Sequence, residues 1–251
     1  MKRYFIELAY NGSKYHGWQI QPGASSIQEE LNRALTTLLR QEIYVVGAGR
    51  TDTGVHASFF VAHFDTETPL PDLSQTVYKL NRLLDKDIAI YRLYPVASDM
   101  HARFSALSRT YKYYIDKGKD PFSYLFAWRA YPLPDIQKMN EACRILFEYT
   151  DFTSFSKLHT DVNNNNCTIL EAYWEETDKQ LIFTIRANRF LRNMVRAIVG
   201  TLIEIGRGKL TLQEFRNIIE SQNRCNAGTS VPAQGLFLYA IEYPESIALK
   251  E

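Results

Sequence analysis

The stretch "GAGRTDTGVHA" (Gly47–Ala57) joins two segments that the sequence predicts to be strands. "EIYVVG" (42–47) precedes it and "SFFVAHFDT" (58–66) follows it, and both are rich in β-branched and aromatic residues. The stretch holds three glycines beside Arg50 and Asp52, and glycine permits close backbone approach by a partner. We therefore expect a turn at a sheet edge that presents Asp52 on a bare backbone. A purely structural interpretation stands beside this one, because aspartate in a turn often hydrogen-bonds its own backbone.

Further predicted strands and helices surround this turn on both sides. "SSIQEELNRALTTLLR" (25–40) has apolar residues at helical spacing and a capping box of Ser26 and Glu29. The other predicted helices lie near 74–84, 134–147, 188–206 and 211–221, and the other strands near 3–10, 87–96, 103–116, 168–176, 180–188 and 235–244. Interspersed strands and helices of this kind indicate an α+β fold with a mixed, largely antiparallel sheet flanked by helices.

The length of 251 residues fits one large domain or two small ones, and 45% hydrophobic content suffices for a substantial core. We expect two halves of similar content, 1–102 with the aspartate turn and 103–251 with a tyrosine strand and an arginine helix. No run of about 18 apolar residues is present, and the first residues lack the features of a signal peptide. These features predict a cytoplasmic protein.

Cysteine and histidine spacing gives no sign of a metal site. The three cysteines, Cys143, Cys167 and Cys225, are far apart and form no CxxC pair. The five histidines, His159 among them, show no HExxH spacing, so each is expected to pack or to form local hydrogen bonds.

Basic residues gather in two segments although the net charge is only +1, which by itself argues weakly against nucleic-acid binding. Between 186 and 209 there are six basic residues and one acid, and between 101 and 112 there are Arg103, Arg109 and Lys112 with no acid. If both segments faced one groove, that groove would attract a polyanion while the molecule stayed near neutral.

Side chains in both segments allow two interpretations, one catalytic or RNA-binding and the other purely structural. Arg189, Arg192 and Arg196 are spaced three and four apart, so a helix over 188–206 would place them on one face. That face is either solvated or holds one arginine against a carboxylate. In the strand 103–116, Tyr111 and Tyr113 share a face that either packs or stacks on bases.

Five segments together resemble, in the same order, the TruA family of tRNA pseudouridine synthases. They are "AYNGSKYHGWQIQ", "AGRTDTGVHA", "HARFSALSRTYKYYI", "NRFLRNMVRAIVGTLIEIG" and "GLFLYAIEYP", and the resemblance runs from about Tyr4 to Pro244. Two departures are visible. Thr53 stands where the family usually has alanine, and the stretch Asn163–Asn166 is peculiar to this chain.

The resemblance implies two similar α/β halves that share a continuous sheet, with a basic cleft between them. It implies a homodimer that holds tRNA across both subunits and uses neither a metal nor an organic cofactor. The implied reaction isomerises uridine to pseudouridine in the anticodon stem-loop of tRNA, at uridines 38–40.

The resemblance also implies roles for single residues. Asp52 matches the catalytic aspartate, Arg196 the basic residue that pairs with it, and Tyr111 the tyrosine that stacks on the flipped uracil. Arg50 matches the arginine that assists base flipping. Arg103 and Arg109, from the basic segments, are expected to contact phosphates.

Several alternatives stay open at this stage. Asp52 could add covalently to the ring or the sugar, or abstract a sugar proton to give a glycal. A non-catalytic protein that binds or folds tRNA would use the same basic and aromatic residues. An N-glycosidase also needs a carboxylate near a ribose, but it would release free uracil.

Overall fold

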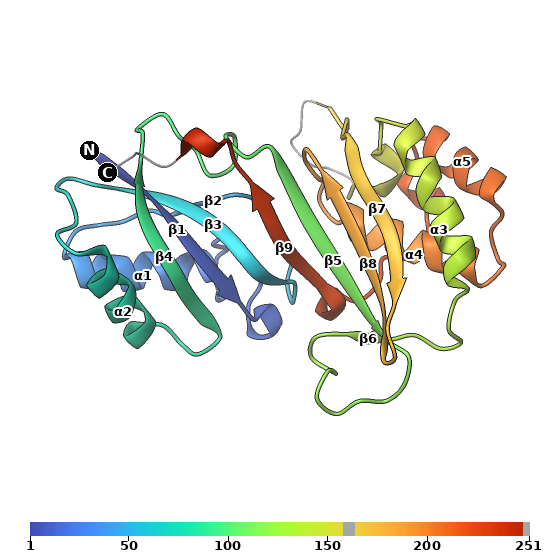
Figure 1. Cartoon of the computed structure of the whole chain (residues 1–251), viewed down its shortest axis with the longest axis horizontal. Helices are drawn as coiled ribbons and strands as arrows, with labels where there is room; N and C mark the ends of the chain where they lie inside the picture. The colour runs from blue at the N-terminus through green and yellow to red at the C-terminus, as the bar shows by residue number, and fades with distance from the viewer. Residues whose placement is uncertain (158–163, 248–251) are drawn as a thin grey trace. The chain divides into compact units, whose positions relative to one another are not determined.

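A computed structural model describes residues 1–157 and 164–247, and the chain divides into two compact units (Figure 1). The first unit comprises Met1–Leu107 and the last segment of the chain, which begins at Leu238, and the second comprises Ser108–Phe237. His159 and Asn163 lie outside the described residues.

The first unit is built on an antiparallel sheet whose middle strand is the first strand of the chain. β1 (Lys2–Tyr10) pairs with β3 (His56–Thr66) on one side and with β4 (Ile88–Val96) on the other. The short β2 (Val46–Gly47) pairs with β3. β9 (Leu236–Glu242), which returns from the far end of the chain, follows β3 in the strand order.

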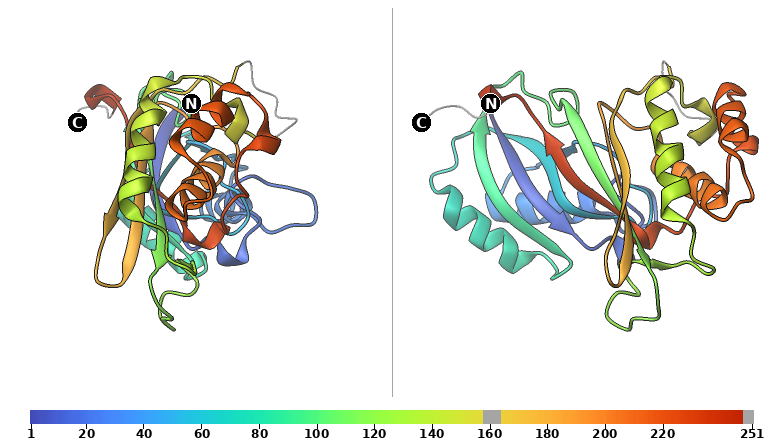
Figure 2. Two further views of the ribbon diagram at one scale, coloured as in Figure 1. Left: turned by 90° about the vertical axis from the view of Figure 1, so that its right-hand side faces the viewer. Right: turned by 45° about the vertical axis from the view of Figure 1, so that its right-hand side comes forward.

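Two helices pack on this sheet. α1 (Ile27–Leu39) begins at Ser26, whose hydroxyl accepts a hydrogen bond from the Glu29 N–H at 3.2 Å. α2 (Leu73–Leu83) packs on β4 and contacts α1 (Figure 2). The fully buried core includes Phe5, Ile6, Leu8, Leu31, Leu35, Phe60 and Phe64.

The second unit also consists of paired strands covered by helices. β8 (Gln180–Ala187) pairs antiparallel with both β5 (Ser108–Asp116) and β7 (Ile169–Glu176), and β6 (Trp128–Arg129) pairs in parallel with β5. α3 (Ile136–Ile145) contacts α4 (Met194–Gly206), α5 (Leu212–Glu220) and β7. The remaining short helices are 3-10 turns at Gly12–Lys14, Leu146–Glu148, Thr153–Phe155, Arg224–Asn226, Ala233–Gly235 and Glu245–Ile247.

The predicted fold class is confirmed, since the described residues form a mixed, largely antiparallel set of strands with flanking helices. The division into 1–102 and 103–251, the sharing of one sheet by the two halves and the basic cleft between them stay predictions. No helix within residues 1–157 and 164–247 is long and apolar enough to span a membrane.

The predicted helix over 188–206 is too long at its start. α4 begins only at Met194, after Asn193, whose φ of 66° lies in the left-handed region. Arg189 and Arg192 therefore precede the helix, and the prediction that they share a helical face with Arg196 is wrong.

The predicted strand over 42–47 is reduced to Val46–Gly47 because side chains of α1 take its backbone groups. The Asn32 Oδ1 accepts from the Val45 N–H at 2.9 Å, and the Gln28 Nε2 donates to the Val45 carbonyl at 2.8 Å. These bonds replace the ladder bonds that a longer strand would make.

Candidate active site

The aspartate turn lies between two paired strands, as the sequence predicts. Pairing of Val46 with His63 and of Gly47 with Ala62 makes residues 48–55 the connection between β2 and β3. Within it, Asp52 is half-buried and its carbonyl accepts a hydrogen bond from the Val55 N–H at 3.1 Å. Arg50 is exposed two residues earlier. The turn thus leaves Asp52 partly exposed.

A second segment, Tyr10–Trp18, holds this turn in place, and we call it the bracing segment. The Trp18 N–H donates to the Thr51 carbonyl and the Gly54 N–H donates to the Tyr15 carbonyl, each at 3.3 Å. The hydroxyls of Tyr10 and Thr51 form a buried hydrogen bond of 2.9 Å. Both sides of Asp52 are therefore bound to the bracing segment.

Glycines allow the bracing segment to approach the turn this closely. Gly17 has a φ of 88°, and a Cβ there would lie 2.2 Å from the Thr51 carbonyl oxygen. A Cβ on Gly12 would lie 2.0 Å from the Val55 carbonyl oxygen. No role for this segment is predicted from the sequence. Glycine and aromatic residues recur together in the bracing segment, and this pattern is a signal of close packing.

Tyr111 lies in the middle of β5, opposite Ile185 of β8. Its ring is half-buried and meets the ring of Phe190 edge to face, with centroids 5.1 Å apart and planes at 86°. Phe190 belongs to the segment before α4. The arrangement fixes the plane of the Tyr111 ring.

Arg196 lies in the first turn of α4 and is bound to a backbone segment that no sequence motif indicates. Its Nε donates to the Val231 carbonyl at 2.7 Å, and the Val231 N–H donates to the Arg196 carbonyl at 3.2 Å. The next carbonyl, that of Pro232, accepts from the Tyr113 hydroxyl at 2.8 Å. Burial raises the pKa of Tyr113, and the charge of Arg196 opposes this rise.

The two predicted phosphate contacts lie in different units. The Arg103 guanidinium is 5.5 Å from the ring centre of Phe104 in the first unit. In the second unit, the Arg109 Nη1 donates to the Asn188 carbonyl at 3.0 Å.

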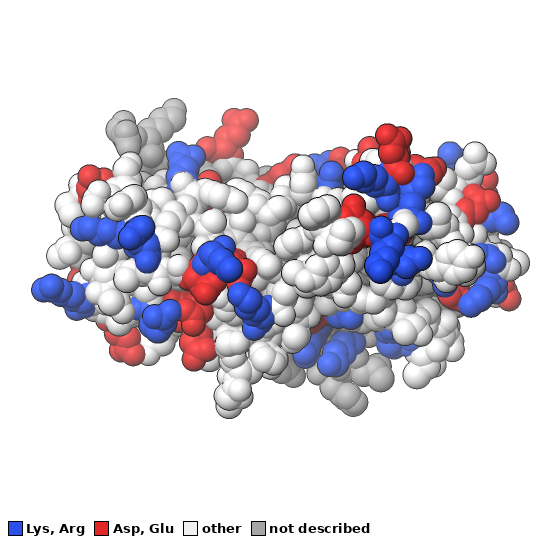
Figure 3. All heavy atoms as spheres, turned by 90° about the horizontal axis from the view of Figure 1, so that it is seen from below, with Lys and Arg blue, Asp and Glu red and all other residues white. Residues whose placement is uncertain are grey.

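Part of the basic run over 186–209 is balanced by acids in its own unit. Arg186 pairs with Glu171 at 2.8 Å, and Lys209 pairs with Glu204 at 3.1 Å. On the face drawn in Figure 3, basic and acidic side chains lie close together in several places. The concentration of basic residues in the sequence therefore overstates the positive field of this segment.

Nothing in the described ranges resembles a metal centre. Within residues 1–157 and 164–247, no three side chains of histidine, cysteine, aspartate or glutamate are grouped so that they could hold an ion.

One part of the chain matches a known protein family. A family model described as tRNA pseudouridine synthase matches residues 142–244. A solved structure of a CRISPR endoribonuclease bound to RNA matches with a TM-score of only 0.19 and 13% identity, so it carries no argument.

Curated relatives then define the particular family. The chain is 56% identical to tRNA pseudouridine synthase A of Parabacteroides distasonis, over 98% of each chain. It is 59% identical to the protein of that name from Bacteroides thetaiotaomicron, over 100% of this chain and 94% of the relative. Identity to the Bacillus subtilis protein is 38%, over 94% and 97% of the two chains. The chain belongs to the tRNA pseudouridine synthase A family.

Proposed function

We propose that this protein isomerises uridine to pseudouridine in the anticodon stem-loop of tRNA, at uridines 38–40. The observation that carries the proposal is the similarity to tRNA pseudouridine synthase A at 56% identity over 98% of both chains.

The reaction neither adds nor removes atoms. The bond from the ribose C1′ to the uracil N1 breaks, and a bond from C1′ to C5 forms. C5 loses its proton and N1 gains one, so the RNA keeps its mass. This reaction needs a carboxylate to act at the sugar or the ring, an aromatic ring to stack on the base, and exclusion of water.

In this proposal Asp52 is the catalytic carboxylate, which acts at the sugar or the ring. Two backbone hydrogen bonds and one hydroxyl pair hold the residues on either side of it, so its position is preorganised. Arg196 pairs with Asp52 and orients its carboxylate. Tyr111 stacks on the flipped uracil, and its half-buried ring suits that role.

RNA binding in this proposal uses the basic side chains outside the catalytic group. Arg50 is exposed two residues before Asp52 and assists base flipping, which costs a few kcal/mol. Arg103 and Arg109 contact phosphates. The protein acts in the cytoplasm as a homodimer that holds tRNA across both subunits, and sedimentation at micromolar concentration tests this with an expected mass of two chains.

Incubation of an unmodified tRNA transcript with wild type and with Asp52→Asn, followed by pseudouridine mapping, tests the function. Wild type should form pseudouridine with no change in RNA mass. Asp52→Asn should bind the transcript but give no product, because its amide is neither a base nor a competent nucleophile.

Three other outcomes would contradict the proposal. Normal product from Asp52→Asn would remove Asp52 from the chemistry. Release of free uracil by wild type would indicate an N-glycosidase. Tight binding by wild type without any product would indicate a protein that only binds or folds tRNA.

A further inference from the structure

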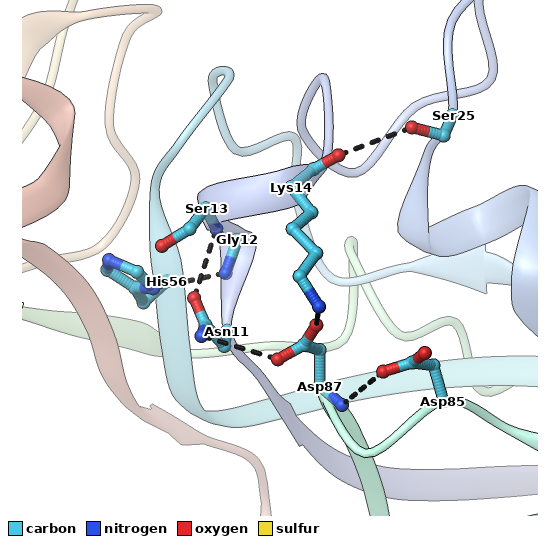
Figure 4. A network of polar contacts seen from close by, with 8 residues as sticks. All are labelled: Asn11, Gly12, Ser13, Lys14, Ser25, His56, Asp85 and Asp87. Atoms are coloured by element: carbon cyan, nitrogen blue, oxygen red, sulfur yellow. Dashed lines mark hydrogen bonds and ion pairs between the residues drawn. The ribbon is translucent and has the colours of Figure 1, made fainter. Parts of the chain in front are cut away.

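His56 is a fully buried polar residue that has no role in the proposed function. It is the first residue of β3, four positions after Asp52, and its side chain is 0% exposed. Its Nδ1 accepts a hydrogen bond from the Gly12 N–H at 3.0 Å (Figure 4). Because a backbone N–H only donates, Nδ1 holds a lone pair and is not protonated. The bond joins the start of β3 to the bracing segment.

Gly12 passes the effect of this bond along the bracing segment. It opens the short 3-10 turn, in which the Tyr15 N–H donates to the Gly12 carbonyl at 3.0 Å. The Tyr15 carbonyl in turn accepts from the Gly54 N–H. A shift of Gly12 therefore moves the Tyr15 carbonyl oxygen. This oxygen holds Gly54, which lies two residues after Asp52.

A second clamp holds the other side of the bracing segment. The Asn11 N–H donates to the Asp87 carbonyl at 2.8 Å. The Lys14 Nζ donates to the Asp87 carboxylate at 2.6 Å (Figure 4). The side chain of Lys14 is 62% exposed, so water can replace that contact. The bond to His56 is buried, and loss of its acceptor would leave a buried N–H unsatisfied.

We infer that His56 is a positioning residue for Asp52, acting through Gly12, Tyr15 and Gly54. The inference rests on the proposed function, in which Asp52 is the catalytic carboxylate. A displacement of about 1 Å from productive geometry can cost about 100-fold in rate. The buried bond limits such displacement.

Two substitutions at His56 separate the effect of losing the hydrogen-bond acceptor from the effect of changing the side-chain volume. His56→Leu fills the space but offers no acceptor, whereas His56→Asn keeps an acceptor oxygen close to the position of Nδ1. We expect His56→Leu to lower kcat about 10- to 100-fold, with KM for tRNA within about two-fold of wild type. His56→Asn should recover most of this loss.

His63→Leu is the matched control. His63 lies on the same strand, is 4% exposed, and its Nδ1 accepts from the Ala102 N–H at 3.1 Å. The variant His63→Leu therefore loses the same kind of hydrogen bond, but at a place away from the aspartate turn. We expect a comparable drop in Tm and an unchanged kcat.

Amide hydrogen exchange gives a readout that does not depend on activity. In His56→Leu the amides of Gly12, Trp18 and Gly54 should exchange faster, while those of β1 and β4 keep their wild-type rates. Unchanged exchange at these three amides, or a kcat equal to that of wild type, would overturn the inference. An equal loss of kcat in His63→Leu would overturn it as well.

If His56→Leu does not fold, His56→Gln replaces it, because its carboxamide oxygen is displaced by one carbon. A lower kcat is expected there, and a wild-type kcat would overturn the inference. Failure of the proposed function is distinguishable, because wild type would then be inactive on tRNA or Asp52→Asn would be active.

Discussion

At the scale of single residues, Arg196 combines a structural bond with its proposed catalytic contact. Its Nε is committed to the Val231 carbonyl at 2.7 Å, which fixes the plane of the guanidinium. Lysine keeps the charge but has neither the fork nor the fixed plane. Arg196→Lys should therefore lower kcat/KM about 100-fold while Tm falls by only a few degrees.

Arg216→Lys is the control for this substitution. Arg216 forms an exposed ion pair with Glu148 in the same unit, so its replacement should change neither rate nor Tm appreciably. Full activity of Arg196→Ala would show that the proposed pairing with Asp52 is wrong.

Single residues also differ in how far the sequence could predict their surroundings. The turn around Asp52 was predictable because its signals, glycine and aspartate between two apolar runs, are local. The partner of Arg196 was not, because Val231 lies 35 residues away in the chain. The two glycines of the bracing segment are visible in the sequence, but the contact of this segment with the turn depends on tertiary packing.

At the scale of elements, prediction succeeded where the periodicity was strong and the caps were local. α5 lies within the predicted range 211–221 and begins with a capping box, in which the Thr211 hydroxyl accepts from the Glu214 N–H and the Glu214 side chain accepts from the Thr211 N–H. Prediction failed before α4, where Phe190 and Leu191 continue the helical spacing of apolar residues. Phe190 packs on Tyr111, so its apolar character serves a contact with β5 and not the helix.

The start of α4 depends on Asn193, which gives a prediction at this scale. Its backbone is left-handed and its Nδ2 donates to the Ser230 hydroxyl at 2.6 Å. Asn193→Gly loses only the side-chain bond and should cost about 1 kcal/mol of unfolding free energy. Asn193→Ala also places an ordinary residue in the left-handed region and should cost about 2 kcal/mol or more.

Urea unfolding of both variants measures the difference. Equal losses in the two variants would show that the left-handed backbone of Asn193 does not set the start of the helix.

At the scale of the whole chain, most of the last strand, from Leu238 onward, belongs to the first unit. The Tyr243 hydroxyl donates to the Ala102 carbonyl at 2.6 Å, and the Leu107 N–H donates to the Glu242 carbonyl at 2.8 Å. Local patterning predicted that 235–244 is a strand, but it carries no information on which strands lie beside it. The pairing partner of a strand is a non-local property, so the sequence alone could not assign it.

Two histidines of the first unit, the buried His63 and the half-buried His101, make the stability of the protein depend on pH. Burial, the charge of Arg3 and the neighbouring His101 lower the pKa of His63 to about 4. The pKa of His101 is lowered as well, mainly by burial. In the unfolded chain a histidine has a pKa of about 6.5, so below that pH the unfolded state binds protons that the native state does not.

The sign of the effect follows from this difference in bound protons. Above about pH 6.5 both states hold neutral histidines and their titration contributes nothing, whereas the unfolding free energy falls as the pH drops from about 6.5 towards 4. His63→Asn keeps an acceptor for the Ala102 N–H but cannot titrate, so it should make this fall shallower. It should not abolish the fall, because His101 remains.

Urea midpoints measured between about pH 7 and about pH 5 test this expectation. His16→Asn, a change at an exposed histidine, is the control and should keep the wild-type slope. A slope in His63→Asn as steep as that of wild type would show that His63 takes up its proton in the native protein. The hydrogen bond from Ala102 would then have to break without loss of the fold, because a protonated Nδ1 cannot accept it.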